Sequence, residues 1–575
     1  MSTNPNKLQL FEVPQIDSIQ DMLIKSVERY KNKIALEDLT NYAINKATYS
    51  ELYDYVLKFG SALQKIGIKP KDHIAVIGEN RIQWAISYLT AMMFDLVVVP
   101  VDKGLPHGDI LNIIHESDST ALIFSGSLKE LFKDKKEVLV KLKHYICMDM
   151  ETKENDIYSM TELIKNEPLT NAPLPKINPD DVAEIIYTSG SLGRAKGVML
   201  TQKNLATNLV AMRQMVTINP EDRFLGVLPI HHTYQCTCGL LCPLYSGASV
   251  HFARSLKTIP EDMANTKPTV LLGAPLLYNK MYNKIMKTIQ SKKTSSLLVN
   301  VLINLTDITQ NIGWKNSKKL LFGKLHKTLG GSMRLLIAGG AAPDPKVSKF
   351  FREVGFTIIQ GYGLTETAPI LALNRLEDFK DAAAGLPLPN VEIKIDKPDK
   401  NGIGEIIVRG PSVMPGYYKN PSATNETFEN EWFKTGDLGY VDEDGFLFIN
   451  GRKKNVIIAN NGENVYPEEI EDILNRNQFV LESMVYGEED EKHDERIAAL
   501  IVPDTAVFIE YSTNNNVQIT PELVDQIISD AVKETNRQLP AFKQIKKFYL
   551  HESELEKTTT QKVKRYMVSV AVSQN

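Results

Sequence analysis

Residues 187–197 read YTSGSLGRAKG and follow an apolar, strand-like run at 182–186. The segment combines three glycines with two serines, a threonine and a lysine. Glycines let several backbone N–H groups approach one anion, and the hydroxyls and the lysine add further donors. The stretch therefore predicts a phosphate-binding loop at the end of a strand. It lacks the closing Gly-Lys-Ser/Thr of the P-loop, and taken alone it is also compatible with a flexible Gly/Ser turn.

The region before this loop alternates between helical and extended patterns. Residues 48–51 read TYSE, a capping box that predicts a helix N-terminus. Apolar residues then recur at spacings of three and four, as on one helix face, up to residue 66. Short apolar runs predict strands at 74–77, 96–101 and 121–124, with a helix over 81–93. This alternation predicts an α/β fold in which a parallel sheet is covered on both faces and binds ligands at its open edge.

The C-terminal part has a different pattern. Residues 405–409 alternate apolar and polar side chains, and 446–449 form a second strand-like run in what we expect to be a more antiparallel region. A smaller α/β segment follows, with a helix at 467–475, a strand at 497–502 and a helix at 521–537. A chain of 575 residues is too long for one core. We therefore expect two domains, residues 1–451 and 452–575.

The composition is that of a globular protein in a reducing compartment. Hydrophobic residues make up 43% of the chain, charged residues 24%, and the formal net charge is −4, so no basic field favours nucleic acid. Four cysteines in this length do not form a disulfide framework. Residues 1–14 lack the apolar segment of a signal peptide, and no apolar run reaches the roughly 18 residues of a spanning helix. We expect a cytoplasmic protein with no nucleic-acid partner.

Four further motifs follow the glycine-rich loop along the chain. Residues 360–367 read QGYGLTET, 432–437 read WFKTGD, 451–454 read GRKK and 557–565 read KTTTQKVKR. In this order they resemble the core motifs of the adenylate-forming superfamily, which includes acyl-CoA synthetases, the adenylation domains of peptide synthetases and firefly luciferase. The resemblance extends from about residue 48 to residue 565.

This resemblance implies a fold and a reaction. The fold has a large N-terminal domain of parallel and mixed sheets flanked by helices, plus a distorted barrel, and a small, mobile α+β C-terminal domain. The small domain rotates between two half-reactions about a hinge at Lys454, and the loop containing Gly462 lines a pantetheine tunnel. In the first half-reaction a carboxylate attacks the α-phosphate of ATP and releases pyrophosphate. In the second, a thiol displaces AMP.

The resemblance assigns catalytic roles to three residues. Thr188 and Glu366 fall where the family holds Mg²⁺, a hard cation that takes oxygen ligands. Lys562 falls on the catalytic lysine of the last motif, which bridges the carboxylate and the α-phosphate where charge builds up. A solvated basic tail is the alternative interpretation of the segment that contains Lys562.

The nucleotide is expected to contact all of these motifs. Tyr362 would pack on adenine, and Asp437 and Arg452 would bind the ribose hydroxyls. The residues that the resemblance assigns to nucleotide binding are Thr188, Ser189, Gly190, Ser191, Gly193, Lys196, Gly339, Gly340, Ala341, Gly361, Tyr362, Gly363, Thr365, Asp437 and Arg452.

The chain departs from the family pattern at three positions. The phosphate loop has Leu192 where threonine is usual and Ala195 where proline is usual, and the last motif has Gln561 where glycine precedes the lysine. Leu192 removes one hydroxyl donor, which predicts weaker phosphate binding. Gln561 restricts a loop that glycine would leave free. These departures keep open a weakly active acyl- or nucleotide-binding homologue.

The acyl pocket is expected near residues 228–234, which read LPIHHTY. The resemblance places His232, Tyr234 and Gly273 in this pocket. Two histidines and three cysteines lie close together here, but the Cys-x-Cys-x₃-Cys spacing at 236–242 is poor for zinc. We expect these cysteines to pack in the interior.

Residues 276–330 resemble the corresponding region of long-chain fatty acyl-CoA synthetases. The region contains ten lysines and one acidic residue, Asp307. Apolar residues form one stripe of a predicted helix, at Tyr278, Met281, Tyr282, Ile285 and Ile289. A basic amphipathic helix suits an anionic membrane surface, and a solvated face packed on the core is the alternative.

We therefore expect an AMP-forming long-chain fatty acid–CoA ligase with ATP, Mg²⁺ and coenzyme A, the last as a substrate. The expected partners are the fatty acid, ATP and CoA, with peripheral contact to an anionic membrane and a homodimer as further candidates. An acyl-AMP ligase that loads a carrier-protein pantetheine is the main alternative, because both share the first half-reaction.

Overall fold

The computed structural model describes residues 9–40, 42–135, 137–169, 173–188, 195–290, 317–340, 343–459, 462–489, 495–557 and 563–565. The chain divides into two compact units. Unit 1 comprises Met1–Glu392, Val408–Phe433 and Glu443–Leu447. Unit 2 comprises Ile393–Ile407, Lys434–Asp442 and Phe448–Asn575. The chain passes between the units several times, and the domain boundary at residue 452 stays a prediction.

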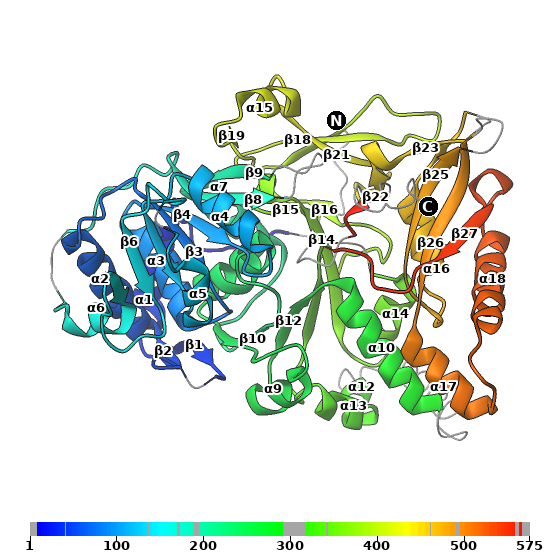
Figure 1. Ribbon diagram of the computed structural model, residues 1–575, viewed down its shortest axis with the longest axis horizontal. Helices are drawn as coiled ribbons and strands as arrows, with labels where there is room; N and C mark the ends of the chain where they lie inside the picture. The colour runs from blue at the N-terminus through cyan, green and yellow to red at the C-terminus, as the bar shows by residue number, and fades with distance from the viewer. Residues whose placement is uncertain are drawn as a thin grey trace. The chain divides into compact units, whose positions relative to one another are not determined.

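One sheet of unit 1 has eight strands in the order β19-β9-β8-β4-β3-β5-β6-β7 (Figure 1). Neighbouring strands from β8 to β7 are parallel, and β9 is antiparallel to both β8 and β19. The strands are β3 (His73–Ile77), β4 (Val97–Val101), β5 (Ala121–Phe124), β6 (His144–Cys147), β7 (Ile157–Ser159), β8 (Val182–Thr188), β9 (Lys196–Thr201) and β19 (Gly416–Tyr417). The three strands expected between residues 74 and 124 are confirmed as β3, β4 and β5.

The two N-terminal helices that the sequence predicts, after residue 48 and over 81–93, are confirmed as α2 and α3. In α2, the Thr48 hydroxyl accepts from the Glu51 N–H at 3.2 Å, and the Glu51 carboxylate accepts from the Thr48 N–H at 2.8 Å. This reciprocal pairing satisfies backbone donors that an uncapped helix leaves free. The helices of this part are α1 (Ile19–Tyr30), α2 (Tyr49–Lys65), α3 (Ile82–Met93), α4 (His107–Glu116), η1 (Gly126–Leu128), α5 (Lys129–Phe132) and α6 (Met160–Asn166).

A second sheet of unit 1 has nine strands in the order β16-β15-β14-β13-β12-β10-β11-β1-β2. Its central strands are parallel, and Gly273, Ala338 and Gln360 are register partners near the carboxyl ends of β12, β13 and β14. The strands are β1 (Ile34–Asp38), β2 (Lys46–Thr48), β10 (Arg223–Gly226), β11 (Ser249–Phe252), β12 (Val270–Gly273), β13 (Leu335–Ala338), β14 (Thr357–Gly363), β15 (Ile370–Leu373) and β16 (Leu386–Pro387).

The remaining helices of unit 1 belong to the segments between these strands. An apolar cluster that includes Tyr278, Phe350, Phe351 and Phe356 joins the second sheet to α10 and α14. The helices are α7 (Gln202–Met215), the π-helix η2 (Tyr234–Leu241), α8 (Cys242–Ser246), α9 (Ile259–Thr266), α10 (Pro275–Gln290), α12 (Ser317–Leu321), α13 (Gly323–Thr328), α14 (Pro345–Glu353), η3 (Thr365–Thr367) and α15 (Pro421–Thr427).

A five-stranded sheet runs in the order β17-β18-β21-β20, with β22 paired to β21. The strands expected at 405–409 and 446–449 are confirmed as β18 and β22, although β22 begins later and extends to Arg452. The five strands are β17 (Glu392–Asp396), β18 (Gly404–Arg409), β20 (Phe428–Glu429), β21 (Trp432–Val441) and β22 (Leu447–Arg452).

The C-terminal part of unit 2 has its own apolar core, which includes Ile470, Val485, Ile501 and Ile528. β25 is antiparallel to β26, and β26 is parallel to β27. The elements are η4 (Lys453–Asn455), β23 (Ile457–Ile458), β24 (Asn464–Val465), α16 (Pro467–Leu474), β25 (Val480–Glu489), β26 (Glu495–Pro503), α17 (Thr505–Asn515), α18 (Pro521–Arg537), η5 (Ala541–Lys543) and β27 (Lys547–Leu550). Both expected helices and the expected strand are confirmed, as is the α/β fold class. Among the residues described, no helix is long and apolar enough to cross a bilayer.

Candidate active site

The glycine-rich loop connects two antiparallel strands of the eight-stranded sheet. Thr188 ends β8 and Lys196 begins β9, and the two are register partners. The Thr188 hydroxyl donates to the Lys196 carbonyl at 3.5 Å. The strand pairing thus places the first and last residues of the predicted phosphate loop side by side. Four predicted residues of the loop, Ser189, Gly190, Ser191 and Gly193, lie outside the described residues, as does Leu192.

The predicted metal ligand Glu366 lies in the short 3₁₀ helix that follows β14. Its Oε1 accepts a hydrogen bond from the Tyr417 hydroxyl at 2.9 Å, and its backbone carbonyl accepts from the Met414 N–H at 2.8 Å. The Nζ of Lys196 lies 5.0 Å from the centroid of the same Tyr417 ring. Glu366 and Lys196, 170 residues apart in the sequence, therefore contact one tyrosine. Carboxylate and hydroxyl oxygens are the ligands that Mg²⁺ prefers, so the donor types of Glu366 and Thr188 fit this ion.

Two glycines near the ends of β13 and β14, Gly339 and Gly363, lie too close to their neighbours to carry a side chain. A Cβ at Gly339 would lie 2.6 Å from the Tyr234 ring, and one at Gly363 would lie 1.8 Å from the Pro369 carbonyl oxygen. Both distances are shorter than any real contact allows. The predicted adenine-binding segment is thus a place where the backbone passes close to its neighbours, which suits backbone contact with a flat base. Of this set, Ala341 lies outside the described residues.

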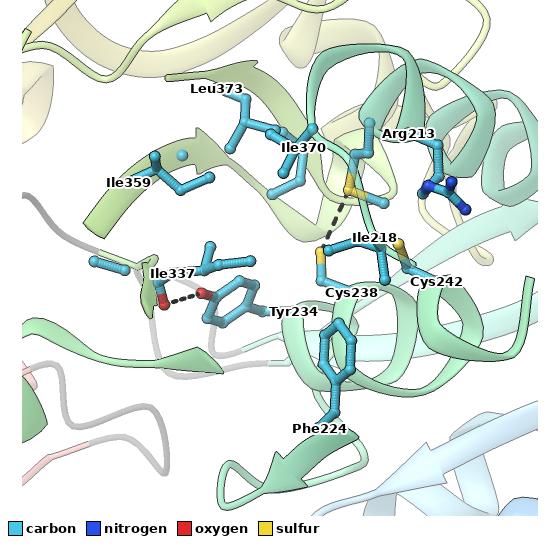
Figure 2. A pocket seen from close by; sticks show the side chains of 14 residues that line it. Arg213, Ile218, Phe224, Tyr234, Cys238, Cys242, Ile337, Ile359, Ile370 and Leu373 are labelled. Carbon is cyan, nitrogen blue, oxygen red and sulfur yellow. Dashed lines mark hydrogen bonds between the residues drawn. The ribbon is translucent and has the colours of Figure 1, made fainter. Parts of the chain in front are cut away.

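An apolar pocket lies between β13, β14, β15 and the helices α7, η2 and α8 (Figure 2). The Tyr234 hydroxyl donates to the Ile337 carbonyl at 3.0 Å and fixes the ring in the pocket wall. The Cys238 thiol lies 3.6 Å from the Met212 sulfur. Figure 2 shows isoleucine side chains of the strands facing Tyr234 and Cys238 across the pocket. The lining residues are Met212, Arg213, Val216, Ile218, Phe224, Tyr234, Cys238, Cys242, Ile337, Ala338, Ile359, Gly361, Ile370 and Leu373.

The pocket wall is almost wholly apolar, and its one charged lining residue among those described points its charge elsewhere. The guanidinium of Arg213 donates to the Ser246 hydroxyl and lies 5.7 Å from the Tyr245 ring centroid, both in α8. The aliphatic part of the Arg213 side chain therefore lines the pocket wall. Such a wall suits a hydrocarbon chain.

Of the three residues predicted for the acyl pocket, the structure places only Tyr234 in its wall. His232 precedes the π-helix, and its ring centroid lies 4.3 Å from that of His231. Gly273 ends β12, beside the pocket strand β13. The assignment of His232 and Gly273 stays a prediction.

Of the three cysteines near the pocket, Cys236 and Cys242 are buried and Cys238 is partly exposed. Burial raises the pKa of the Cys236 and Cys238 thiols well above the usual value, and that of Cys242 to about 11. A thiol must lose its proton to bind a metal. Within the described ranges, no group of three or more His, Cys, Asp or Glu side chains could hold a metal ion.

In unit 2, two residues of separate motifs meet. The Nε of Arg452 lies 2.8 Å from Oδ1 of Asp437, and its Nη1 donates to the Thr435 carbonyl at 3.2 Å. Asp437 is 5% exposed, so its carboxylate is held in place by this pairing. The structure thus brings together the two residues predicted to bind ribose, and the ribose contact itself stays a prediction.

The remaining predictions for unit 2 concern its loops. Lys454 lies in η4, and Gly462 has φ +78°, a conformation that favours glycine. Their roles as hinge and tunnel residues stay predictions. Lys562 and Gln561 lie outside the described residues, and Lys557 and Val563 on either side form a β-bridge.

The apolar stripe predicted over 278–289 packs on the protein core. The Tyr278 ring lies 6.4 Å from Phe351, and the Tyr282 ring 5.0 Å from Phe350, both in α14. Met281 and Ile285 contact the same cluster. Of the two interpretations of the stripe, the core-packed one is correct for these residues. The lysines of α10 lie on its exposed side, at Lys280, Lys284 and Lys287.

Two segments of the chain match known protein families in sequence comparison. Residues 23–418 match the AMP-binding enzyme family, and residues 469–562 match the AMP-binding enzyme C-terminal domain. The chain belongs to the AMP-binding enzyme family. The members of this family are AMP-forming acid–thiol ligases that bind ATP.

Curated relatives in this family carry fatty acid names. The long-chain-fatty-acid–CoA ligase FadD15 of Mycobacterium tuberculosis is 28% identical over 97% of this chain and 96% of its own. Fatty acyl-CoA synthetase B of Dictyostelium discoideum is 30% identical over 84% and 76%. The long-chain-fatty-acid–[acyl-carrier-protein] ligase AEE15, chloroplastic, of Arabidopsis thaliana is 28% identical over 85% and 76%.

Solved structures share the fold of this AMP-binding enzyme. The anthranilate CoA ligase AuaEII in complex with anthranoyl-AMP has a TM-score of 0.78 at 21% identity, over 97% of this chain and 98% of its own. The o-succinylbenzoate coenzyme A synthetase MenE of Bacillus subtilis, in complex with ATP and magnesium, has a TM-score of 0.71 at 23% identity, over 95% and 99%.

Tyr417 and most of the pocket wall were missed by sequence reasoning. Tyr417 stands in the run Gly-Tyr-Tyr-Lys, in which nothing distinguishes it from Tyr418. The pocket residues come from seven helices and strands and from the segment after α7, and most are ordinary apolar positions in the sequence.

Proposed function

We propose that this protein activates a long-chain fatty acid with ATP to an acyl-adenylate and then transfers the acyl group to coenzyme A. The observation that carries the proposal is the apolar pocket beside the predicted nucleotide residues. Ala338 and Gly361 line the pocket, and Gly339 and Tyr362 follow them directly in the chain. A carboxylate bound beside these residues would place its hydrocarbon chain in the pocket, where each buried CH₂ contributes about 0.8 kcal/mol.

In the first step, a carboxylate oxygen of the acid attacks the α-phosphorus of ATP. The new P–O bond forms as the bond between the α-phosphorus and its bridging oxygen breaks, and pyrophosphate leaves. The protein's part is to hold the two reactants in line and to neutralise the charge that builds up. Lys196 would contact the phosphates, and Lys562 would bridge the carboxylate and the α-phosphate.

Mg²⁺ would supply charge neutralisation at the phosphate oxygens. Glu366 and Thr188 would hold it through oxygen ligands. The Glu366 carboxylate is oriented before any ligand binds, because the Tyr417 hydroxyl donates to one of its oxygens at 2.9 Å.

In the second step, the sulfur of a thiol attacks the acyl carbonyl. A C–S bond forms, the C–O bond to AMP breaks, and the thiol proton is released. Asp437 and Arg452 would hold the ribose, and the loop that contains Gly462 would line the path of the thiol arm.

The names of the relatives support long-chain acids and leave two thiol acceptors. Most name coenzyme A, and one names an acyl-carrier protein. Carrier-protein loading is therefore the second candidate. A weakly active binding homologue is the third, and the retained Glu366, Asp437, Arg452 and Lys562 argue against it.

Pyrophosphate release across C2 to C18 acids tests the proposal, with CoA, with an acyl-carrier protein bearing pantetheine, or with neither. We expect pyrophosphate release with acids of about twelve carbons or more. We expect repeated turnover, measured as release of AMP, to require CoA. Turnover with the carrier protein alone would favour the second candidate. No pyrophosphate release with any acid would contradict adenylation.

We also propose weak contact between α10 and anionic membranes. Its exposed lysines, Lys280, Lys284 and Lys287, contribute at most about 1 kcal/mol each near such a surface. Binding to anionic vesicles should therefore be weak, and it should be lost in high salt, on neutral vesicles and in a Lys284→Glu/Lys287→Glu variant. The control is Lys346→Glu/Lys349→Glu, at exposed positions of α14. Binding that changes with neither the salt concentration nor the α10 substitutions would contradict membrane contact through α10.

A further inference from the structure

Tyr417 contacts two residues of the predicted phosphate and metal site and is itself buried, at 7% exposed. Its hydroxyl donates to Oε1 of Glu366 at 2.9 Å, and its ring centroid lies 5.0 Å from the ammonium of Lys196. The two contacts use different parts of the side chain. A hydroxyl orients an anion, and an aromatic face attracts a cation.

The backbone on both sides of Tyr417 fixes its position. Tyr417 pairs with Val198 in β9, and its N–H donates to the Thr424 hydroxyl at 2.9 Å. The next N–H, of Tyr418, donates to the Gly197 carbonyl at 2.7 Å. The side chain therefore extends from a strand that is registered against the strand that begins at Lys196.

Glu366 is tied to the same segment by a second bond. The Met414 N–H, three residues before Tyr417, donates to the Glu366 carbonyl at 2.8 Å. Backbone and side chain of Glu366 are thus both held by residues 414–417. One carboxylate oxygen is taken by the Tyr417 hydroxyl, and the second can turn to a cation.

We propose that Tyr417 is a positioning residue for the magnesium complex of a nucleoside triphosphate. It orients the Glu366 carboxylate through its hydroxyl, and it holds the Lys196 ammonium over its ring, without touching the ligand. The proposal rests on the proposed function for the identity of Glu366 as metal ligand and Lys196 as phosphate contact. The alternative is that Tyr417 only packs in the interior.

The chain offers a matched control in the next residue. The Tyr418 hydroxyl donates to the Asp118 carboxylate at 2.8 Å, so Tyr418→Phe also removes one tyrosine–carboxylate hydrogen bond. Asp118 belongs to none of the predicted site motifs. Tyr417→Phe removes the hydroxyl and keeps the ring below Lys196, and Tyr417→Leu removes both.

The measurements are ATP binding by calorimetry at several Mg²⁺ concentrations, and the Mg²⁺ dependence of pyrophosphate release. For Tyr417→Phe we expect the Mg²⁺ concentration that gives half the maximal rate of pyrophosphate release to rise about tenfold. A tenfold change corresponds to the loss of one charge-assisted hydrogen bond to the metal ligand. Saturating Mg²⁺ should restore most of the rate, which a purely structural role would not predict. Tyr417→Leu should also weaken ATP binding without Mg²⁺. Tyr418→Phe should match the wild type in both.

Three outcomes would contradict parts of this proposal. If Tyr417→Phe and Tyr418→Phe have the same Mg²⁺ dependence, Tyr417 is not a positioning residue. If the wild type binds Mg²⁺–ATP but activates no fatty acid, the proposed function fails and the Tyr417 result still stands. If the wild type binds no nucleotide under any condition, both are wrong. Thermal melting of each variant shows whether a loss of binding comes from unfolding.

Discussion

Arg565 and Glu471 form an ion pair in unit 2, in which one Nη of the guanidinium donates to both carboxylate oxygens. The other Nη donates to the Val485 carbonyl at 2.8 Å. Burial raises the pKa of the Glu471 carboxyl to about 7, and Arg565 opposes this rise. The pair thus joins the end of the last motif to α16 and β25. At the start of that motif, Lys557 pairs with Glu482 at 2.8 Å.

We predict that Arg565→Ala lowers the rate of adenylation by about 10- to 100-fold. The reason is that Lys562 lies three residues before Arg565, and a misplacement of about 1 Å in a catalytic group can cost a factor of this size. Single-turnover pyrophosphate release measures the effect. Arg537→Ala is the control, because Arg537 is exposed at the end of α18. A wild-type rate in Arg565→Ala would show that the pair does not position the last motif.

Lys562→Ala should separate the two half-reactions. We expect acyl-adenylate formation to fall by about 100-fold or more, because a charged group at the α-phosphate is lost. Thioester formation from added acyl-adenylate should be largely kept, since we expect the second step to use another face of the small domain. Both steps are measured on the same preparation. Equal loss in both would indicate misfolding or a single domain pose, and no loss in either would indicate a basic tail without a catalytic role.

The free energy of unfolding should fall as the pH rises from about 4.5 to about 8. Burial raises the pKa of the Glu184 carboxyl from 4.5 to about 8. Among the described residues, Oε1 has no hydrogen-bond partner, and Oε2 accepts from the Tyr88 hydroxyl at 3.2 Å. The folded state therefore keeps this proton over a pH range in which the unfolded chain loses it. The resulting loss of stability is a few kcal/mol, on the order of 1.4 kcal/mol per pH unit.

Melting temperatures between pH 5 and pH 8 test this prediction in three proteins. Glu184→Gln carries no titrating proton, so its melting temperature should change less with pH than that of the wild type. Glu130→Gln, at an exposed position, should follow the wild type. A Glu184→Gln variant with the wild-type pH dependence would show that another group is responsible.

Local sequence patterns were sufficient to predict single elements of the fold, such as α2, α3, β3, β4 and β5. The helix after Thr48 begins where the capping box predicts, and its apolar residues Leu52, Val56, Phe59 and Leu63 are all buried. Such patterns work because they depend on residues a few positions apart. The motifs likewise brought Asp437 and Arg452 together correctly, since each lies at a fixed place on its strand.

Contacts between distant segments could not be predicted in the same way. Tyr417 reaches Glu366 because β19 pairs with β9, and no local pattern specifies that pairing. The apolar stripe of α10 had two interpretations. A periodic apolar face shows that some surface covers it, but the sequence does not say which surface that is. Here Phe350 and Phe351 of α14 cover it.

Acyl chain length should be set by the pocket around Cys238. For the wild type, we expect kcat/KM to rise about fourfold per added CH₂, from about 0.8 kcal/mol for each group buried, and to level off where the pocket ends. Cys238→Phe places a ring in the middle of the pocket (Figure 2). Excluding four CH₂ groups would cost about 3 kcal/mol, so activity on C16 should fall by more than 100-fold while C8 is affected less.

The control at the same position is Cys238→Ser, which keeps the volume of the side chain and should keep the chain-length profile. Steady-state kinetics with C6 to C18 acids, followed by pyrophosphate release, compare the three proteins. A profile for Cys238→Phe that is lowered equally at all lengths would show that the acyl chain lies elsewhere. Activity that peaks at acetate or at aryl acids in the wild type would contradict the long-chain proposal, and would leave the AMP-binding family as the only assignment.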